Sequence, residues 1–262
     1  MAGHPICEDA TSPEAVAHFA ATGWVHVRPP GAGTLASRLQ AWADEVAAWP
    51  EGEGGWLQYR EQTDAGPALC RTENLVDHHP DLRGLLTRGP LLAAAGALLG
   101  EEAVLYKDKL NHKLPGGAGY APHQDAPAYR FVELHVSCMV AIDDATGDNG
   151  CLEVASGAHD RLWPTDEAGC LRDDVVASLE WQAVPLQAGD TLWFHSRTPH
   201  RSGPNRSDRP RRALYPTYNA RREGDLRAAY YRRKAEELAA ATARGDRVPV
   251  SLIGDFQGRP VT

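Results

Sequence analysis

Residues 104–114 read VLYKDKLNHKL, and residues 132–142 read VELHVSCMVAI. Polar and apolar residues alternate in both runs, as they do along a strand that buries one face. Many short strands separated by turn residues are typical of a β-sandwich or a closed barrel. The stretch from residue 104 to residue 218 therefore predicts a mainly β core. Further strand candidates, separated by Gly, Pro, Asn and Asp, lie at 150–154, 184–186, 191–195 and 212–218.

The residues before this core contain helical patterns. Ser12 followed by Pro13 is a typical helix start, and this helix is expected to run to about Ala21 and to end at Gly23. A short strand is expected next, at 24–27. It is followed by a helix capped by Thr34 that ends before Pro50, and by a helix from Pro90 to Leu99 closed by Gly100.

Two other segments complete the expected organisation. Residues 51–75 are rich in Gly and polar residues and predict a long loop, of the length that often forms a lid over a binding site. Residues 225–243 carry an amphipathic pattern that predicts a helix on the outside of the core. The chain is predicted to be one α+β domain over residues 1–262, with a helical N-terminal region over 1–100.

Composition narrows the class of protein. The chain has 262 residues, 42% of them hydrophobic, and a net charge of −8, which gives no support for binding nucleic acid or an anionic membrane. The longest apolar stretch, 91–99, is too short to span a bilayer. Five cysteines without a C-x-x-C pair, and an N-terminus unlike a secretory signal, predict reduced thiols in a cytoplasmic protein. The oligomeric state stays open.

The triplet His123-Gln124-Asp125 is the first candidate for chemistry. Residues at i and i+2 of an extended segment point the same way, so one imidazole and one carboxylate can converge on an ion. His200 is the candidate third ligand. Two histidines and a carboxylate leave positions open for a chelating cosubstrate and dioxygen on iron(II). Among eleven histidines such a triplet also arises by chance, and taken alone it favours a hydrogen-bonded core or turn role for His123.

The segment after His200 reads HRSGPNRSDRPRR over residues 200–212. Its turn residues predict a loop that leaves one strand and enters the next near Arg211. An arginine on the second strand could pair with the far carboxylate of a dicarboxylate bound to the metal. The alternative is a solvated basic turn, because the arginines of this segment cannot all be functional.

The stretch 104–218 resembles the phytanoyl-CoA dioxygenase family of iron(II)/2-oxoglutarate oxygenases. The resemblance covers a little under half of the chain and is looser in the N-terminal third. The blocks that carry it are PHQD at 122–125, AIDD at 141–144, NGCLEV at 149–154, SGAH at 156–159, GD at 189–190, FH at 194–195, HRSGPN at 200–205, and Arg211.

The resemblance implies a double-stranded β-helix, a cupin-like jelly roll with flanking helices. It implies His123, Asp125 and His200 as the metal triad. Arg211 matches the residue that pairs with the far carboxylate of 2-oxoglutarate, and Ser202 matches its hydroxyl partner. His195 fits the ligand position less well than His200, because the Ser-Gly-Pro-Asn run follows residue 200. His159 belongs to a turn and is expected to be structural.

One face of the first strand is rich in cations: Leu105, Lys107, Lys109, Asn111 and Lys113 alternate along it. A half-buried strand with a solvated basic side is an equally good interpretation. In the resembling family a residue near Asn111 contacts the cosubstrate, which implies Asn111 and Lys109 as cosubstrate contacts. The surplus of lysines suggests an anionic substrate. Together with Arg71-Thr72-Glu73-Asn74, the strand is similar to the branch that hydroxylates small organophosphonates, which adds Lys107, Lys113, Arg71 and Asn74 as candidate substrate residues.

The resemblance also implies a reaction. Iron(II), 2-oxoglutarate and O2 would yield succinate, carbon dioxide and a hydroxylated, formerly unactivated C–H bond. Related halogenases lack the carboxylate ligand, so Asp125 favours hydroxylation. Desaturation or cyclisation, and a natural-product or acyl substrate, remain alternatives. Two other classes stay open as well, a zinc hydrolase with the same three ligands and a non-catalytic barrel that binds a small molecule.

Overall fold

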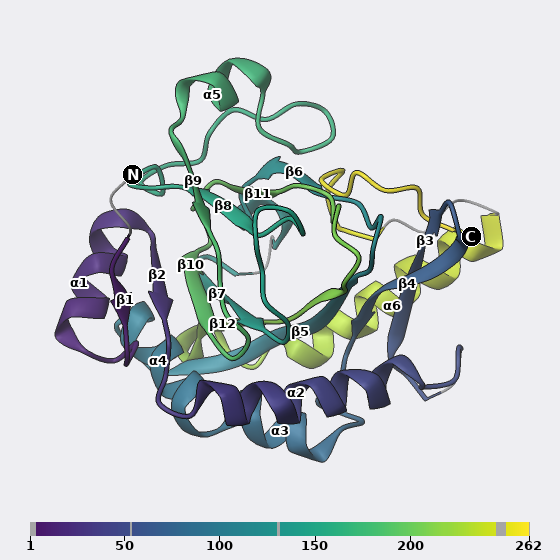
Figure 1. The fold of residues 1–262 in the computed structure, drawn as a ribbon, viewed down its shortest axis with the longest axis horizontal. Helices are drawn as coiled ribbons and strands as arrows, with labels where there is room; N and C mark the ends of the chain where they lie inside the picture. Colours follow the sequence, from purple (N-terminus) through teal and green to yellow (C-terminus); the bar gives the residue numbers. More distant parts are fainter. Residues whose placement is uncertain (1–3, 53, 130–131, 245–249, 262) are drawn as a thin grey trace.

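The computed structural model describes residues 4–52, 54–129, 132–244 and 250–261. Two β-sheets face each other and form the barrel seen end-on in Figure 1. The order of the larger sheet is β1-β2-β10-β7-β12-β5-β4-β3, and that of the smaller is β6-β11-β8-β9. Neighbouring strands are mostly far apart in sequence, as in a jelly roll. The predicted double-stranded β-helix is therefore confirmed.

The strands have the following bounds. The larger sheet contains β1 (Ile6–Cys7), β2 (Trp24–Val27), β3 (Leu57–Thr63), β4 (Gly66–Glu73), β5 (Ala103–Lys113), β7 (His135–Ala141), β10 (Thr191–His195) and β12 (Arg211–Ala220). The smaller sheet contains β6 (Tyr120–His123), β8 (Leu152–Ala155), β9 (Trp181–Val184) and β11 (His200–Ser202).

Successive side chains along a strand point to opposite faces and pack into two separate cores. On β7, Cys138 and Val140 belong to the core between the large sheet and the helices, whereas Met139 and Ala141 belong to the core inside the barrel. Both faces of this strand are buried, so a polar side chain on it is unusual and indicates a specific role. Ser137 is such a residue, and it faces the barrel interior near the candidate metal ligands.

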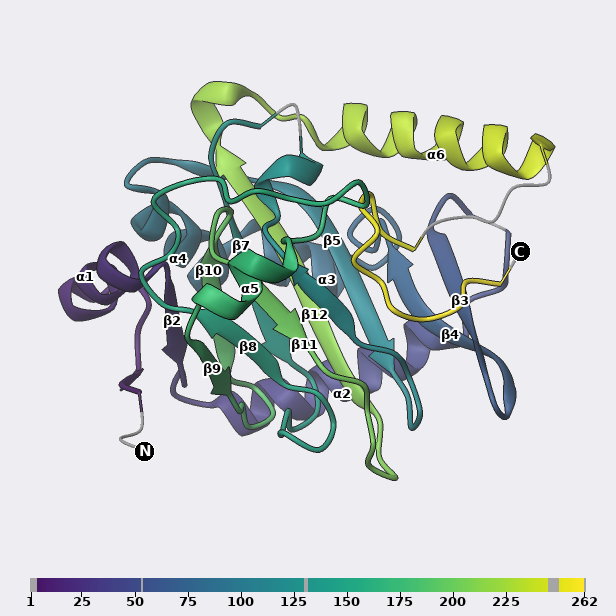
Figure 2. The same cartoon turned by 90° about the horizontal axis from the view of Figure 1, so that it is seen from above.

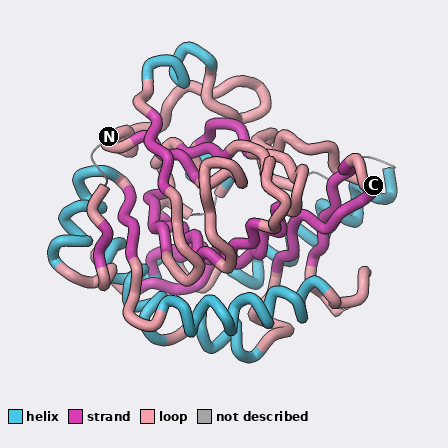
Figure 3. Tube along the Cα trace, viewed as in Figure 1, coloured by secondary structure: helices cyan, strands magenta, loops and turns pink. Residues whose placement is uncertain are grey.

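Helices cover the outer face of the large sheet (Figures 1 and 3). These helices are α1 (Pro13–Thr22), α2 (Ala32–Ala47), α3 (Pro80–Thr87) and α4 (Gly89–Leu99). Helix α5 (Asp173–Ser178) lies on the side of the smaller sheet, and α6 (Arg227–Arg244) lies at one end of the barrel. Two short 3-10 turns are η1 (Ala126–Ala128) and η2 (Arg221–Glu223). Among the described residues, no helix combines the length and the apolar character needed to cross a bilayer. The five cysteines are buried free thiols.

The helix starts and ends follow the predictions with one exception. Ser12 accepts a hydrogen bond from the Ala15 amide at 3.2 Å, and Gly23 ends α1 at a φ of 84°. The prediction that Thr34 caps the second helix is wrong. Gly31, at a φ of 80°, turns the chain into α2 one turn earlier, so Thr34 lies inside the helix.

The predicted long loop at 51–75 is also wrong for most of its length. It forms the hairpin of β3 and β4, and β4 pairs with β5 so that Arg71 lies opposite Asn111. These strands lie at the edge of the sheet and carry polar residues on the less buried face, so their sequence lacks the apolar alternation of a core strand. The segment that was expected to be a lid is part of the pocket wall.

Helix α6 has almost the predicted bounds, and it packs on the outside of the core with most of its described residues exposed. Figure 2 shows it running across the end of the barrel at which β12 finishes. Tyr230, Tyr231 and Lys234 are at most 8% exposed. The inward side of α6 therefore closes one end of the barrel instead of covering its flank.

Candidate active site

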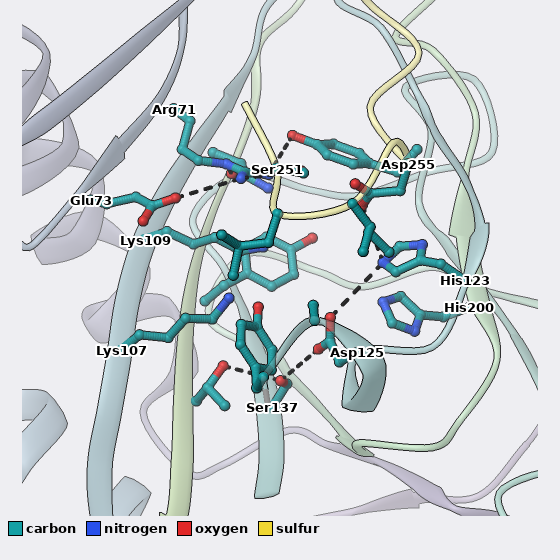
Figure 4. Close-up of a pocket in the computed structure, with 18 of the residues that line it drawn as sticks. Arg71, Glu73, Lys107, Lys109, His123, Asp125, Ser137, His200, Ser251 and Asp255 are labelled. Carbon is teal, nitrogen blue, oxygen red and sulfur yellow. Dashed lines mark hydrogen bonds and ion pairs between the residues drawn. The ribbon is translucent and has the colours of Figure 1, made fainter. Parts of the chain in front are cut away.

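The predicted metal ligands converge at one point of the barrel wall. His123 ends β6, Asp125 follows it at the start of η1, and His200 begins β11, where it pairs directly with His123 across the small sheet. One ligand atom from each of the three residues lies within 4.8 Å of the other two. Figure 4 shows all three side chains facing the same pocket.

Each histidine is oriented by a backbone carbonyl. Nδ1 of His123 donates to the carbonyl oxygen of Ala121 at 2.7 Å, and Nδ1 of His200 donates to that of Thr198 at 3.0 Å. The Nε2 atoms are then left with lone pairs for a metal. Burial and the neighbouring His123 lower the pKa of His200 to about 4, so this ring is neutral at physiological pH.

Asp125 is held as an anion. Burial alone would raise its pKa, but His200, in the protonated form that it takes at low pH, and the nearby Lys107 and Lys109 outweigh burial and keep the pKa well below its usual range. Oδ2 of Asp125 accepts a hydrogen bond from the Ser137 hydroxyl at 2.9 Å, and Ser137 in turn contacts the Thr217 hydroxyl at 3.1 Å. The carboxylate is therefore ionised and oriented before any ligand arrives.

A second carboxylate supports the presence of a cation. Oδ2 of Asp255 lies 3.3 Å from Nε2 of His123. Because Nδ1 of this ring donates to a carbonyl, Nε2 of a neutral ring carries a lone pair. This lone pair would face Oδ2 of Asp255, which is also an acceptor. A metal ion at Nε2 removes this conflict. Two oriented imidazoles and an ionised carboxylate are a donor set that suits iron(II), so the residues present fit the implied metal.

The pocket in front of the triad holds about 700 Å³ of space, including open solvent at its mouth. Among its described lining residues, the cations are Arg71, Lys107, Lys109 and Lys234, and the carboxylates are Glu73, Asp125 and Asp255. A bound divalent metal adds further positive charge. The site as a whole therefore suits more than one anionic ligand.

The distribution of lysine is unusual. The chain has four lysines, at positions 107, 109, 113 and 234, and all four belong to its described part. Three of them are buried, and Lys109 is half-buried. Lysine is rarely buried without a partner. Every lysine of the protein lies at or beside the pocket, whereas arginine supplies the exposed positive charges.

Lys107 and Lys109 face the pocket from β5. Their Nζ atoms lie 4.0 Å from the ring centre of Tyr129 and 5.2 Å from that of Tyr215. Within the described part of the chain, neither ammonium has a hydrogen bond or an ion pair. Burial lowers the pKa of Lys107 well below its usual value and that of Lys109 to about 8. Without a ligand, burial therefore disfavours the charged form of both groups, and a bound anion would favour it.

Each guanidinium nitrogen of Arg71 already has a hydrogen-bond partner. Its Nε donates to Oδ1 of Asn111 at 3.0 Å, one terminal nitrogen donates to the Tyr120 hydroxyl at 3.0 Å, and the other donates to the carbonyl of Val250. Arg71 also pairs with Glu73 at 3.5 Å, and Lys234 of α6 donates to Glu73 at 2.6 Å. This network joins β4, α6 and the C-terminal segment.

Arg211 lies behind the pocket surface. It is 1% exposed, it donates to the Tyr215 hydroxyl at 3.3 Å, and its Nε has no partner among the described residues. Lys113 lies opposite it on β5 and donates to the Ser202 hydroxyl at 3.0 Å. A buried guanidinium with a free donor, beside an ammonium and two hydroxyls, fits the far carboxylate of a dicarboxylate.

The remaining predicted residues lie elsewhere or are already bonded. Asn74 is outside the pocket: its amide nitrogen donates to the Gly55 carbonyl at 3.0 Å, and its oxygen accepts from Arg227 at 2.6 Å. Nδ1 of His195 accepts a hydrogen bond from the Arg197 amide at 3.0 Å, and its ring packs on His159. Neither histidine joins the triad.

Several lining residues were missed by the sequence analysis. Glu73 was quoted there only as part of a motif, and the others gave no local signal because their contacts join segments that are distant in sequence. They are Glu73, Tyr120, Tyr129, Ser137, Tyr215, Thr217, Tyr230, Lys234, Ser251 and Asp255.

Comparisons with known proteins agree with this geometry. Residues 19–213 match the phytanoyl-CoA dioxygenase family. Methylphosphonate hydroxylase of Gimesia maris is 46% identical over 85% of this chain and 86% of its own length. The 2-aminoethylphosphonate dioxygenase of the uncultured bacterium HF130_AEPn_1 is 37% identical over 85% of this chain and 87% of its own length.

A solved structure extends the likeness to the fold and its ligands. The epimerase SnoN from nogalamycin biosynthesis, in complex with Fe3+, alpha-ketoglutarate and nogalamycin RO, superposes with a TM-score of 0.67 at 26% identity. The match covers 80% of this chain and 85% of that one. The chain belongs to the phytanoyl-CoA dioxygenase family and is an iron(II)- and 2-oxoglutarate-dependent dioxygenase.

Proposed function

We propose that this enzyme hydroxylates a C–H bond of a small organophosphonate, with His123, Asp125 and His200 holding iron(II). Bound iron supplies the chemistry that couples decarboxylation of 2-oxoglutarate to oxidation of the substrate. The protein's own residues bind and orient both anions and keep water from the reacting carbon.

The observation that carries the proposal is the pair Lys107 and Lys109. Both reach the pocket with aromatic rings as their neighbours and without an anionic partner at hydrogen-bond distance among the described residues. Holding desolvated ammonium groups in this way costs free energy unless a ligand compensates. One 2-oxoglutarate leaves part of this charge unpaired, so a second anion is expected.

We assign the cosubstrate to the end of the pocket near Arg211 and Ser202. The free Nε of Arg211 and the Tyr215 hydroxyl support this assignment for the far carboxylate. Lys113 belongs to the same end, because its ammonium already donates to Ser202 and to the Gly203 carbonyl at 2.6 Å. We keep Asn111 and Lys109 as cosubstrate contacts, since both line the pocket beside Tyr215.

The substrate is assigned to the end near Lys107. Arg71 shapes this wall instead of binding the phosphonate, because each of its guanidinium nitrogens already has a hydrogen-bond partner. Asn74 lies outside the pocket and drops out of the proposal. Two relatives carry the names of enzymes that act on phosphonates, which favours this acidic group over a carboxylate or a sulfonate.

The test is a substrate panel. Iron-loaded enzyme with 2-oxoglutarate is supplied with methylphosphonate, 2-aminoethylphosphonate, or the uncharged dimethyl ester of methylphosphonate, and succinate is measured. We expect the free phosphonates to stimulate succinate formation and the ester not to. Stimulation by the uncharged ester alone would overturn the proposal.

Two alternatives are less well supported. A zinc hydrolase needs no partner for a distant carboxylate, so it leaves the buried donor of Arg211 unexplained. A non-catalytic barrel does not agree with the family to which the chain belongs. We also propose that the enzyme works in the cytoplasm, since its five cysteines are free thiols, as expected in a reducing compartment.

A further inference from the structure

The C-terminal segment 250–256 forms one wall of the pocket, although it lies beyond the residues that match the family. Three contacts fix its position. Arg71 donates to the Val250 carbonyl, the Ala121 amide donates to the Asp255 carbonyl at 2.7 Å, and the rings of Tyr120 and Phe256 lie 5.4 Å apart. A side chain on this segment can therefore act on a ligand with a defined geometry.

Asp255 is the charged residue of this segment that lines the pocket. Asp255 is 5% exposed, and its Oδ1 has no hydrogen-bond partner among the described residues. Its Oδ2 contacts Nε2 of His123, which is the atom that a metal would take. Oδ1 still needs a donor in the metal-bound enzyme, because a buried carboxylate oxygen without one costs free energy.

A ligand in the pocket can supply this donor. His123, Asp125 and His200 would already hold iron(II), so a second protein carboxylate is not needed as a ligand. An anionic group is repelled by Asp255. A substrate ammonium or hydroxyl group would donate a hydrogen bond to Oδ1 of Asp255.

We infer that Asp255 is a specificity-determining residue that accepts a hydrogen bond from an ammonium or hydroxyl group on the substrate's carbon chain. The inference rests on the proposed function and narrows its substrate class to small phosphonates that carry such a donor, above all aminoalkylphosphonates. Figure 4 shows Lys107 and Lys109 entering the pocket from one side, with Asp255 and His123 on the other. A zwitterionic substrate would span this distance, with its phosphonate toward Lys107 and its ammonium toward Asp255.

The experiment compares two isosteric substrates, 2-aminoethylphosphonate and propylphosphonate, which differ in an ammonium against a methyl group. We measure kcat/KM for both, and anaerobic binding of both by calorimetry to enzyme loaded with iron(II) and 2-oxoglutarate. Wild-type enzyme is expected to prefer the amine by at least about tenfold, because a site built for a hydrogen-bond donor rejects an analogue without one. Asp255→Asn is expected to reduce this preference to about threefold or less.

Asp208→Asn is the matched control, because it removes the same charge at an exposed position and should keep the wild-type preference. Iron stoichiometry and the thermal midpoint are measured for each variant. An Asp255→Asn enzyme with an unchanged preference overturns the inference, and so does one that loses iron and both substrates equally, which would make Asp255 a metal ligand. Turnover of propylphosphonate as well as the amine by wild type leaves the proposed function standing without the inference. Turnover of neither of these two phosphonates overturns the inference, and only a lack of turnover of methylphosphonate as well would overturn the proposed function.

Discussion

The two walls of the pocket differ in how completely they are bonded. On the metal wall, built from β6, η1 and β11, both histidines donate to backbone carbonyls and Asp125 accepts from Ser137. On the cation wall, Lys107 and Lys109 of β5 face aromatic rings. The first wall is organised before a ligand binds, and the second is completed by ligands. Damage to the metal wall should therefore abolish all turnover, whereas damage to the cation wall should change which anions bind.

The largest effect is expected on the metal wall. Asp125→Ala should lose iron and reduce activity on every substrate by more than about a thousandfold, since even second-sphere changes cost 10–100-fold. Iron content and succinate formation measure the change. Asp208→Ala, at an exposed acid, is the control. A variant that kept iron and activity would show that the three residues are not the metal centre.

The next effect separates cosubstrate from substrate. Arg211→Ala should raise the KM for 2-oxoglutarate about a hundredfold, because truncating a desolvated charge partner costs about 2–5 kcal/mol. The KM for the phosphonate should change little. Arg212→Ala is the neighbouring control, because Arg212 pairs with Asp143 at 2.8 Å away from the pocket. An unchanged KM for 2-oxoglutarate in the Arg211 variant would show that another residue binds the far carboxylate.

Lys107→Met tests the cation wall directly. It should raise the KM for the phosphonate about tenfold and that for 2-oxoglutarate less, because one charge-assisted contact is lost. Since burial disfavours the charged form of Lys107, the free energy of unfolding without ligands should stay within about 1 kcal/mol of wild type or rise. Steady-state kinetics and denaturant unfolding measure the two effects. A large loss of stability with unchanged KM would make Lys107 structural.

The smallest expected effect is on pH dependence. Burial and the nearby Arg71 lower the pKa of Lys109 to about 8, so its ammonium is charged below this pH and loses its proton above it. Affinity for the anionic ligands should therefore fall between pH 8 and 9, by about threefold. Lys109→Arg stays charged over this range and should flatten the profile. Equal profiles for both proteins would assign the change to ionisation of the ligands instead.

Much of the site could be predicted from the sequence because its information is local. His123 and Asp125 are two residues apart on an extended segment, and the period of a strand alone turns them the same way. The alternation of β5 likewise put Lys107, Lys109 and Asn111 on one face, and all three line the pocket. His200 came from the run that follows it, which resembles a family motif.

Other features were decided only by tertiary structure. Asp255 meets His123 across 132 positions of sequence, and Lys234 meets Glu73 across 161. Whether Arg71 and Asn74 are free to bind substrate depends on which groups already occupy their donors and acceptors. The hairpin of β3 and β4 was mistaken for a loop, because an edge strand needs little apolar surface.

The sequence by itself therefore determined the barrel, the triad and the cationic strand, since side-chain periodicity and short spacings are properties of the local backbone. Only the tertiary structure decided that α6 and the C-terminal segment close the pocket, that Arg71 is occupied, and that Asp255 faces the metal ligands. The physical reason is that partners distant in the chain are brought together by packing of the whole molecule, and no local pattern records such a contact.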